Sequence, residues 1–161
     1  MTQGENLADE LRRALHKGAW HGPALEELLA SISLEEARQR PIPNAHNIWE
    51  LVLHLASWSN IALRRIQGGQ PEPFPGEDWP DIGGFTQDHW DKACAALTEN
   101  HERLSEVVAA LTDKELASKA PQSSRSIAAM INGVVQHAAY HGGQIALLSK
   151  AVSRHHRRAA L

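Results

Sequence analysis

TQDHWDKACAALTENHERLSEVVAAL, residues 86–111, is the stretch that decides the fold. The residues on its apolar face recur at spacings of 4, 3, 4, 3, 4 and 3. They are Trp90, Cys94, Leu97, His101, Leu104, Val108 and Leu111. This spacing is a heptad seam, which is typical of a helix that packs along partner helices. The stretch therefore predicts a long helix, over about 86–111, in an all-α bundle.

Three other segments have helical apolar spacing, and no segment has the alternation of a strand. The segment before 86–111 runs from about 47 to 67, where Asn47 is a suitable N-cap and Glu50 completes a capping box. The segment after it runs from about 127 to 152. Residues 112–125, between the segments 86–111 and 127–152, are polar and predict a loop.

The first segment, from about residue 6 to 33, is broken by Gly18, Gly22 and Pro23. Pro23 can open a second helical piece, because a proline at the first helical position loses only an amide that had no partner. With this segment the chain has four main helices. We expect one domain over 1–152, followed by a basic, flexible tail over 153–161.

Residues 69–85, GQPEPFPGEDWPDIGGF, contain four prolines and four glycines and show no periodic pattern. At roughly 3.3 Å per residue this segment could span about 50 Å, more than the length of a bundle helix. It could therefore carry the chain from one end of the bundle to the other. We expect a long crossover here, with the helices on either side of it parallel.

Composition excludes several function classes. The chain has 161 residues, a net charge of −3 and a single cysteine, Cys94. The acidic balance argues against a nucleic-acid partner, and one cysteine excludes an intramolecular disulfide and a cysteine metal cluster. No apolar run is long enough to span a membrane, and the first residues lack the pattern of a signal peptide. These features suit a reducing, cytoplasmic compartment.

Three histidines lie on apolar helical faces. His137 and His141 are four residues apart, so a helix places both rings on one face. His54 lies on the apolar face of the segment over 47–67. Buried imidazoles need hydrogen-bond partners or a metal, and three histidines with an open position form the pattern of a catalytic zinc site. We predict a divalent metal bound by these three residues, more weakly below about pH 6.5, where free imidazoles become charged.

Other residues near these histidines are candidates for supporting or catalytic roles. Glu50 precedes His54 by four residues and could accept its far N–H group or act as a base. Gln144 follows His141 by three and could line the site or orient a ligand. His101 lies on the seam of 86–111 and could be a further ligand, a base, or a core histidine bonded to a backbone carbonyl.

Two consecutive glycines, Gly142 and Gly143, follow His141 directly. Within a helix they cost roughly 2 kcal/mol relative to alanines. We therefore expect either a neighbouring helix or a ligand to need the space beside the metal.

Three motifs resemble the DinB superfamily, in its DinB/YfiT-like form: HNIWELVLHLASW at 46–58, DWP at 78–80 and HAAYHGGQIALL at 137–148. The resemblance extends over nearly the whole chain. It implies a four-helix bundle of DinB/YfiT type with a long crossover between the second and third main helices. It also implies a metal site formed by His54, His137 and His141, with zinc or nickel as the metal.

The resemblance also suggests what such a protein does. Members of this family include bacterial transferases and an isomerase that use a low-molecular-weight thiol as cofactor, and homodimers are common. A small-molecule substrate, a homodimer and a metal-dependent transferase, isomerase or hydrolase are thus expected. The alternative is a non-catalytic, metal-stabilised bundle that binds a small molecule, because three histidines beside an apolar pocket would serve binding equally well.

Overall fold

Four long helices form the core of the computed structural model, which describes residues 1–121 and 123–159, with side chains described as far as Ser153. They are α1 (Gln3–Leu15), α4 (Ile48–Ile66), α5 (Gln87–Ala109) and α7 (Ile127–Ala159). Three short helices, α2 (Leu25–Leu29), α3 (Leu34–Ala37) and α6 (Asp113–Ala117), lie in the connections. The all-α prediction is confirmed, and none of the described helices has the length and apolar character of a membrane span.

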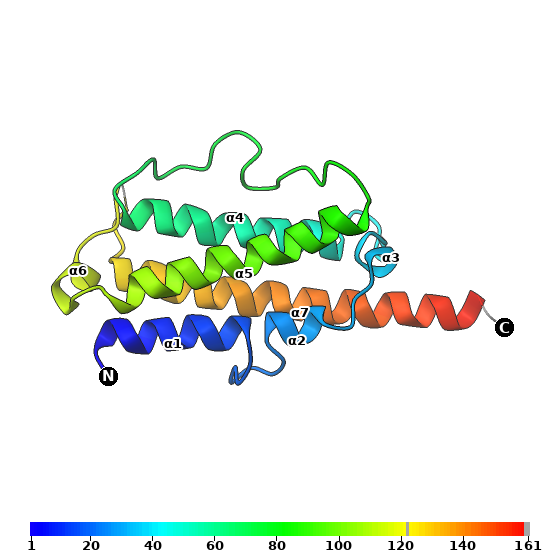
Figure 1. Ribbon diagram of the computed structural model, residues 1–161, viewed down its shortest axis with the longest axis horizontal. Coiled ribbons are helices and arrows are strands. Elements are labelled where there is room, and N and C mark those ends of the chain that lie inside the picture. The colour runs from blue at the N-terminus through cyan, green and yellow to red at the C-terminus, as the bar shows by residue number, and fades with distance from the viewer. Residues whose placement is uncertain (122, 160–161) are drawn as a thin grey trace.

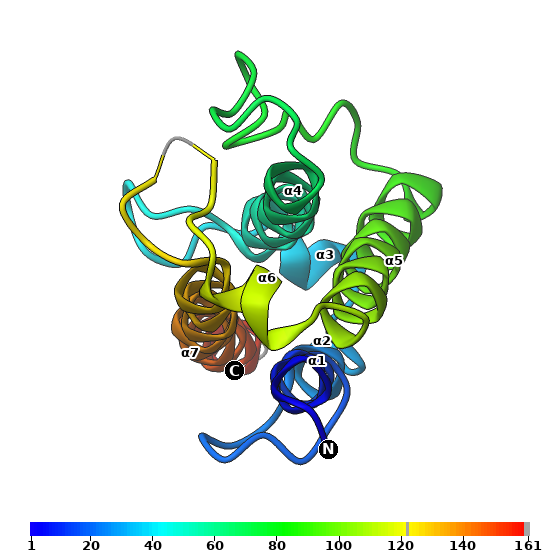
Figure 2. The ribbon, with the colours of Figure 1, turned by 90° about the vertical axis from the view of Figure 1, so that its left-hand side faces the viewer.

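The long helices stand at the corners of a square when viewed end-on (Figure 2). α4 packs against α5 and α7, and α1 packs against the same two helices from the opposite corner. α4 and α5 run in the same direction, and the segment between them returns along the outside of the bundle from one end to the other (Figure 1). The predicted crossover and the parallel pair are therefore confirmed. α7 runs antiparallel to α4 and packs against it.

Capping boxes start most of these helices. At the start of α4 the Asn47 side chain accepts a hydrogen bond from the backbone N–H of Glu50 at 2.9 Å, and the Glu50 carboxylate accepts one from the backbone N–H of Asn47 at 3.0 Å. This confirms the predicted cap. The short helices α3 and α6 were not expected, because residues 34–37 and 113–117 are too few to show an apolar period. Both begin with capping boxes, which Ser33 and Thr112 form with the acid three residues on.

Two predicted boundaries differ from the structure. Pro23 does not open a helix, since α2 begins at Leu25 with Ala24 as its N-cap. α7 continues to Ala159, so the backbone of 153–159 is helical where the sequence predicted a tail. Most of the predicted tail lies outside the described part, which does not include the side chains beyond Ser153 or residues 160–161. The flexibility of this segment therefore stays a prediction.

The buried apolar side chains form two clusters at opposite ends of the bundle. One contains Trp49, Leu97 and Ile145, and the other contains Leu11 and Ile131. Five of the six buried polar residues gather near the boundary between the clusters: His54, Ser59, His101, Ser105 and His141. We call these five residues the polar layer.

Candidate metal centre

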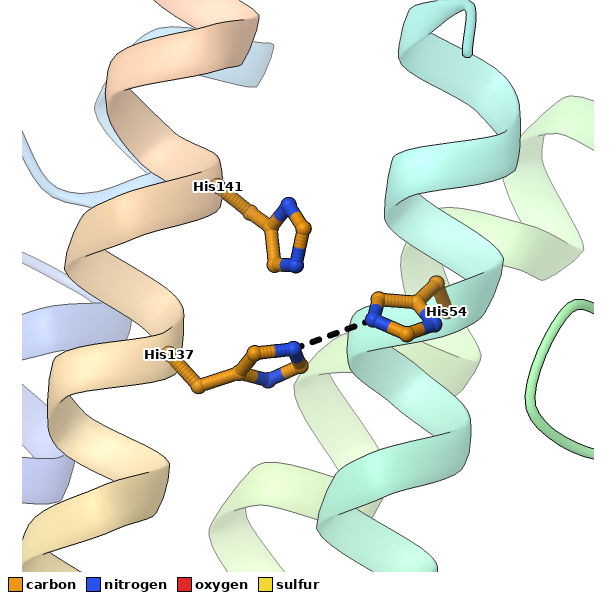
Figure 3. Close-up of side chains that lie close together, drawn as sticks. All are labelled: His54, His137 and His141. Carbon is orange, nitrogen blue, oxygen red and sulfur yellow. Dashed lines mark hydrogen bonds between the residues drawn. The ribbon is translucent and has the colours of Figure 1, made fainter.

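The three predicted histidines converge between α4 and α7. His54 projects from α4, and His137 and His141 project from successive turns of α7 into the same space (Figure 3). One ring nitrogen from each lies within 4.8 Å of the others. The His54 and His141 side chains are buried, and His137 is partly buried. The structure thus brings together the residues that the sequence selected.

Hydrogen bonds at Nδ1 direct the Nε2 atoms of two of the rings toward the shared space, where Nε2 of His54 is hydrogen-bonded to Nε2 of His137 (Figure 3). Nδ1 of His54 lies 2.6 Å from the backbone oxygen of Asp78, and Nδ1 of His141 lies 2.6 Å from Oε1 of Gln144. A backbone carbonyl can only accept a hydrogen bond, so Nδ1 of His54 carries the proton. The amide oxygen of Gln144 is likewise an acceptor, so Nδ1 of His141 also carries the proton. Both Nε2 atoms then carry lone pairs, which is the arrangement of metal-ligating histidines with outer hydrogen-bond partners.

The spacing of the nitrogens also fits a metal ion. Nε2 of His54 and Nε2 of His137 lie 3.0 Å apart. Two nitrogens bound to one zinc at about 2.0–2.1 Å lie about 3.3 Å apart at a tetrahedral angle. Small ring movements would therefore complete the site, and the donor set fits a borderline metal such as zinc or nickel.

The crossover forms one wall of this site. The Trp79 ring stacks flat on the His54 ring, with centroids 3.9 Å apart, and on the His46 ring on its other side, at 3.5 Å. The carboxylate of Asp78 accepts a hydrogen bond from Nε1 of Trp58 at 2.7 Å. The crossover therefore fixes the position of His54 in addition to connecting two helices.

Two more contacts attach the crossover to α4 beside the triad. The backbone oxygen of Glu77 accepts a hydrogen bond from the Ser57 hydroxyl, and its carboxylate forms a two-pronged ion pair with Arg64. The Arg64 hydrogen bonds lower the pKa of Glu77 against a smaller opposing effect of burial. Residues 77–79 are thus held in consecutive contacts with α4.

Burial lowers the pKa of all three imidazoles. For His137, burial together with the neighbouring His141 and His54 lowers the pKa from 6.5 to about 4. For His54 and His141, burial outweighs the hydrogen bonds to Asp78 and Gln144, which act in the opposite direction on the pKa. Neutral imidazole is the form that binds metal. Proton competition with a metal is therefore expected at lower pH than the value of about 6.5 that free histidines suggest.

Glu50 is engaged by other groups. Its carboxylate binds Arg40 at 2.5 Å and His46 at 3.1 Å, besides the backbone N–H of Asn47. Burial would raise the pKa of Glu50, but these hydrogen bonds together lower it. The far N–H of His54 is taken by the Asp78 carbonyl instead of Glu50, which corrects the expected pairing.

His101 is a core histidine. Nδ1 lies 3.0 Å from the Ser59 hydroxyl and Nε2 lies 3.1 Å from the backbone oxygen of Leu11. The side chain is 1% exposed, and burial lowers its pKa to about 4. Both nitrogens are therefore used within the core, as in the structural alternative that the sequence left open, and His101 is placed neither as a ligand nor as a base.

Gln144 is the candidate that the structure places against the triad, and its amide should matter for metal affinity. In Gln144→Met, Nδ1 of His141 loses its acceptor, so the ring is no longer held in the ligating tautomer. We expect metal affinity to fall about 10–100-fold, the usual effect of removing such a partner. Titration of zinc into Gln144→Met and into the control Gln136→Met, an exposed position on the same helix, measures this. Equal affinities would show that Gln144 has no such role.

The structure does not show a need for small residues at Gly142 and Gly143. A Cβ atom added at Gly142 would lie 3.6 Å from Leu25 and Leu28, an ordinary contact. A Cβ atom at Gly143 would meet no described atom within 4 Å. The expectation that a neighbouring helix requires these glycines is therefore wrong among the described residues.

Gly143→Ala should consequently stabilise the protein. The substitution removes the conformational freedom of glycine from a helix interior, which is worth about 0.5–1 kcal/mol. We expect the free energy of unfolding in urea to rise by that amount, with metal affinity unchanged. A lower free energy of unfolding would contradict this prediction.

A cavity of about 420 Å³ lies between α4 and α7 next to the triad. His137 and Trp58 line it, and their ring centroids are 5.9 Å apart. The remaining lining comes from the last turns of α4, the start of the crossover, the segment before α7 and the first turns of α7. Its volume is in the range of small-molecule sites, so a small molecule could reach the triad from the His137 side.

Sequence reasoning did not assign roles to Asp78 and Trp79. A signal for them was present in the DWP motif at 78–80, which contributed to the family resemblance without a function attached. The carbonyl of Asp78 could not have been found, since every residue has a carbonyl group. The flat surface of Trp79 also gives no sign in the sequence of the ring on which it stacks.

Comparison with known proteins agrees with this geometry. A family model described as the DinB superfamily matches residues 18–145, a segment that includes all three histidines. Neither the curated proteins nor the solved structures contain a match to the chain. The family match covers well over half of the 161 residues, and the chain therefore belongs to the DinB superfamily.

Proposed function

We propose that this chain is a divalent-metal-dependent enzyme, with zinc or nickel held by His54, His137 and His141. The observation that carries the proposal is the convergence of the three ring nitrogens within 4.8 Å. Among the described residues no fourth histidine, cysteine or carboxylate joins this cluster. Three protein ligands leave a coordination position for substrate, as in catalytic sites, whereas structural sites are closed by a fourth ligand.

The surrounding residues prepare the site for such a role. The Asp78 carbonyl and the Gln144 amide hold protons on Nδ1 of His54 and His141, which keeps the Nε2 lone pairs directed at one point. Trp79 covers the outer face of His54, and the cavity beside His137 admits a small molecule. A bound divalent ion would act as a Lewis acid that lowers the pKa of a thiol or of water, so that a nucleophile is available near neutral pH.

The nucleophile distinguishes two reaction classes. A low-molecular-weight thiol would give transferase or isomerase chemistry, and water would give hydrolysis. Zinc-loaded and nickel-loaded protein can be assayed for conjugation of cysteine to chlorodinitrobenzene and for hydrolysis of nitrophenyl acetate. We expect a rate in one assay that is lost in His54→Ala and after chelation. Tight metal binding with no rate above that of His54→Ala in either assay would favour the non-catalytic, metal-stabilised binding protein.

We also propose a homodimer, which the family resemblance implies. Tyr140 and Leu147 are exposed by 65% and 66% on one face of α7, where a second copy could cover them. Light scattering at tens of micromolar should then give about twice the chain mass of 17.7 kDa. A mass equal to one chain would contradict the dimer.

A further inference from the structure

The cavity beside His137 carries two cations at the end away from the triad. Arg65 comes from the last turns of α4 and Arg125 from the segment just before α7. α4 and α7 are antiparallel (Figure 1), so Arg65 near the end of α4 and Arg125 just before α7 come from the same end of the bundle, and His137 lies farther along α7. The Trp58 ring lies near both groups, 5.4 Å from the Arg65 guanidinium and 5.9 Å, between centroids, from the His137 ring. The cavity therefore has a basic end and a metal-ligand end.

The charge of Arg65 is not neutralised by an acid in the described part of the chain. Its Nε donates a hydrogen bond to the backbone oxygen of Pro71, and its guanidinium lies 5.4 Å from the centroid of the Trp58 ring. No ion pair of Arg65 or Arg125 occurs among the described residues. Arg64, the preceding residue, differs because it is paired with Glu77. The Arg65 side chain is thus partly buried with donors left over for a ligand.

The rest of the lining restricts the ligand further. Ala62, Met130 and Val134 form apolar walls between the two ends, and Glu72 is the acid among the lining residues. Two arginines and one glutamate leave a single net positive charge in the cavity. A monoanionic group would neutralise that charge, whereas a phosphate dianion would leave a net negative charge in the cavity. Arginine forks recognise carboxylates by paired hydrogen bonds.

From these observations we propose that the cavity binds a small molecule with an apolar body and a carboxylate, the carboxylate on Arg65 and Arg125 and the opposite end beside His137. This inference rests on the proposed function, because it names the substrate class of the same site. It makes Arg65 and Arg125 the residues that select the substrate by charge, and it assigns the apolar walls to the substrate body.

The test compares 3-phenylpropionate with its uncharged amide in calorimetric titrations, on chelator-stripped and on zinc-loaded protein. We expect the carboxylate to bind about tenfold or more tightly than the amide in both preparations, because charge-assisted hydrogen bonds are worth more than neutral ones. Arg65→Met and Arg125→Met should each reduce this preference. Arg125 is exposed, so Arg125→Met should fold even if the half-buried Arg65 is needed for stability.

Two further variants complete the design. A Cβ added at Gly133, which lines the cavity, meets no described atom within 4 Å, so Gly133→Leu fills the cavity and should remove binding of both compounds. Arg103→Met, at an exposed position on α5, removes a charge elsewhere and should change nothing.

The outcomes separate this inference from the proposed function. Equal binding of carboxylate and amide, or a preference that survives both arginine variants, would overturn the inference. A preference found only in zinc-loaded protein and lost in His137→Ala would also overturn it, because the carboxylate would then be a metal ligand. If the wild-type protein proves unable to bind zinc or nickel but still shows an arginine-dependent preference, the inference is supported and the metal-dependent function is contradicted.

Discussion

Alanine in place of His54, His137 or His141 is expected to lower the affinity for zinc and nickel by orders of magnitude. Each substitution leaves two of the three nitrogens that converge within 4.8 Å, and two histidines do not make a stable site for these ions. The measurement is isothermal titration of chelator-stripped, untagged protein, since an added polyhistidine tag would itself bind nickel. His21→Ala, in an exposed loop, is the matched control.

The same variants should lose the stabilisation that the metal gives. A ligand that binds only the folded chain stabilises it by about 4 kcal/mol when present at a thousand times its dissociation constant. We therefore expect zinc to raise the unfolding midpoint of the wild type and of His21→Ala, but not of the triad variants. Tight binding by all of these proteins alike would place the metal elsewhere.

The second large effect concerns acid stability and His101. Burial lowers the pKa of this ring to about 4 in the folded chain, against 6.5 for an ordinary histidine. The unfolded chain then binds more protons between these values, so the free energy of unfolding decreases as the pH falls from about 6.5 to about 4. The loss attributable to His101 is about 3 kcal/mol over this window, and it stops below the folded pKa.

Comparison of chelator-stripped wild type with His101→Gln isolates this effect. The variant keeps polar atoms for Ser59 and the Leu11 carbonyl but cannot be protonated, so its stability should depend less on pH in the same window. His137 contributes a slope of the same sign to both proteins, since its pKa is also lowered to about 4. Urea unfolding at several pH values measures the difference. Identical slopes for the two proteins would contradict the prediction.

The sequence predicted the main helices and the triad because both depend on periodic side-chain patterns. His54, His137 and His141 were found from their places on apolar faces, and the structure brings them together. The two short helices α3 and α6 were missed although Ser33 and Thr112 begin capping-box sequences. Such sequences predict helix starts only weakly when no apolar run follows.

The contacts that orient the triad could not be predicted in the same way. The far nitrogen of His54 has a backbone carbonyl as its partner, and the expected partner Glu50 is held by Arg40. The first outcome depends on where the crossover lies in space and the second on the segment before α4, and segments without periodicity give no information about either. His101 shows the same limit, because its partner Leu11 belongs to a helix 90 residues away in sequence.

The polar layer has a consequence for how the folded chain opens. Two apolar clusters, which share contact mainly at Val135, give each end of the bundle a core of its own near this layer, so we expect one end to unfold locally while the other stays intact. Native-state hydrogen exchange should then divide the amides into two cooperative units, one containing α2 and α3 and the other containing α6 and the start of α1. A metal ion bound by His54 on α4 and by the two histidines on α7 would link these helices near the boundary between the two units. Metal binding should then make the two units exchange together, so that occupancy of the site could be observed in amides far from any histidine.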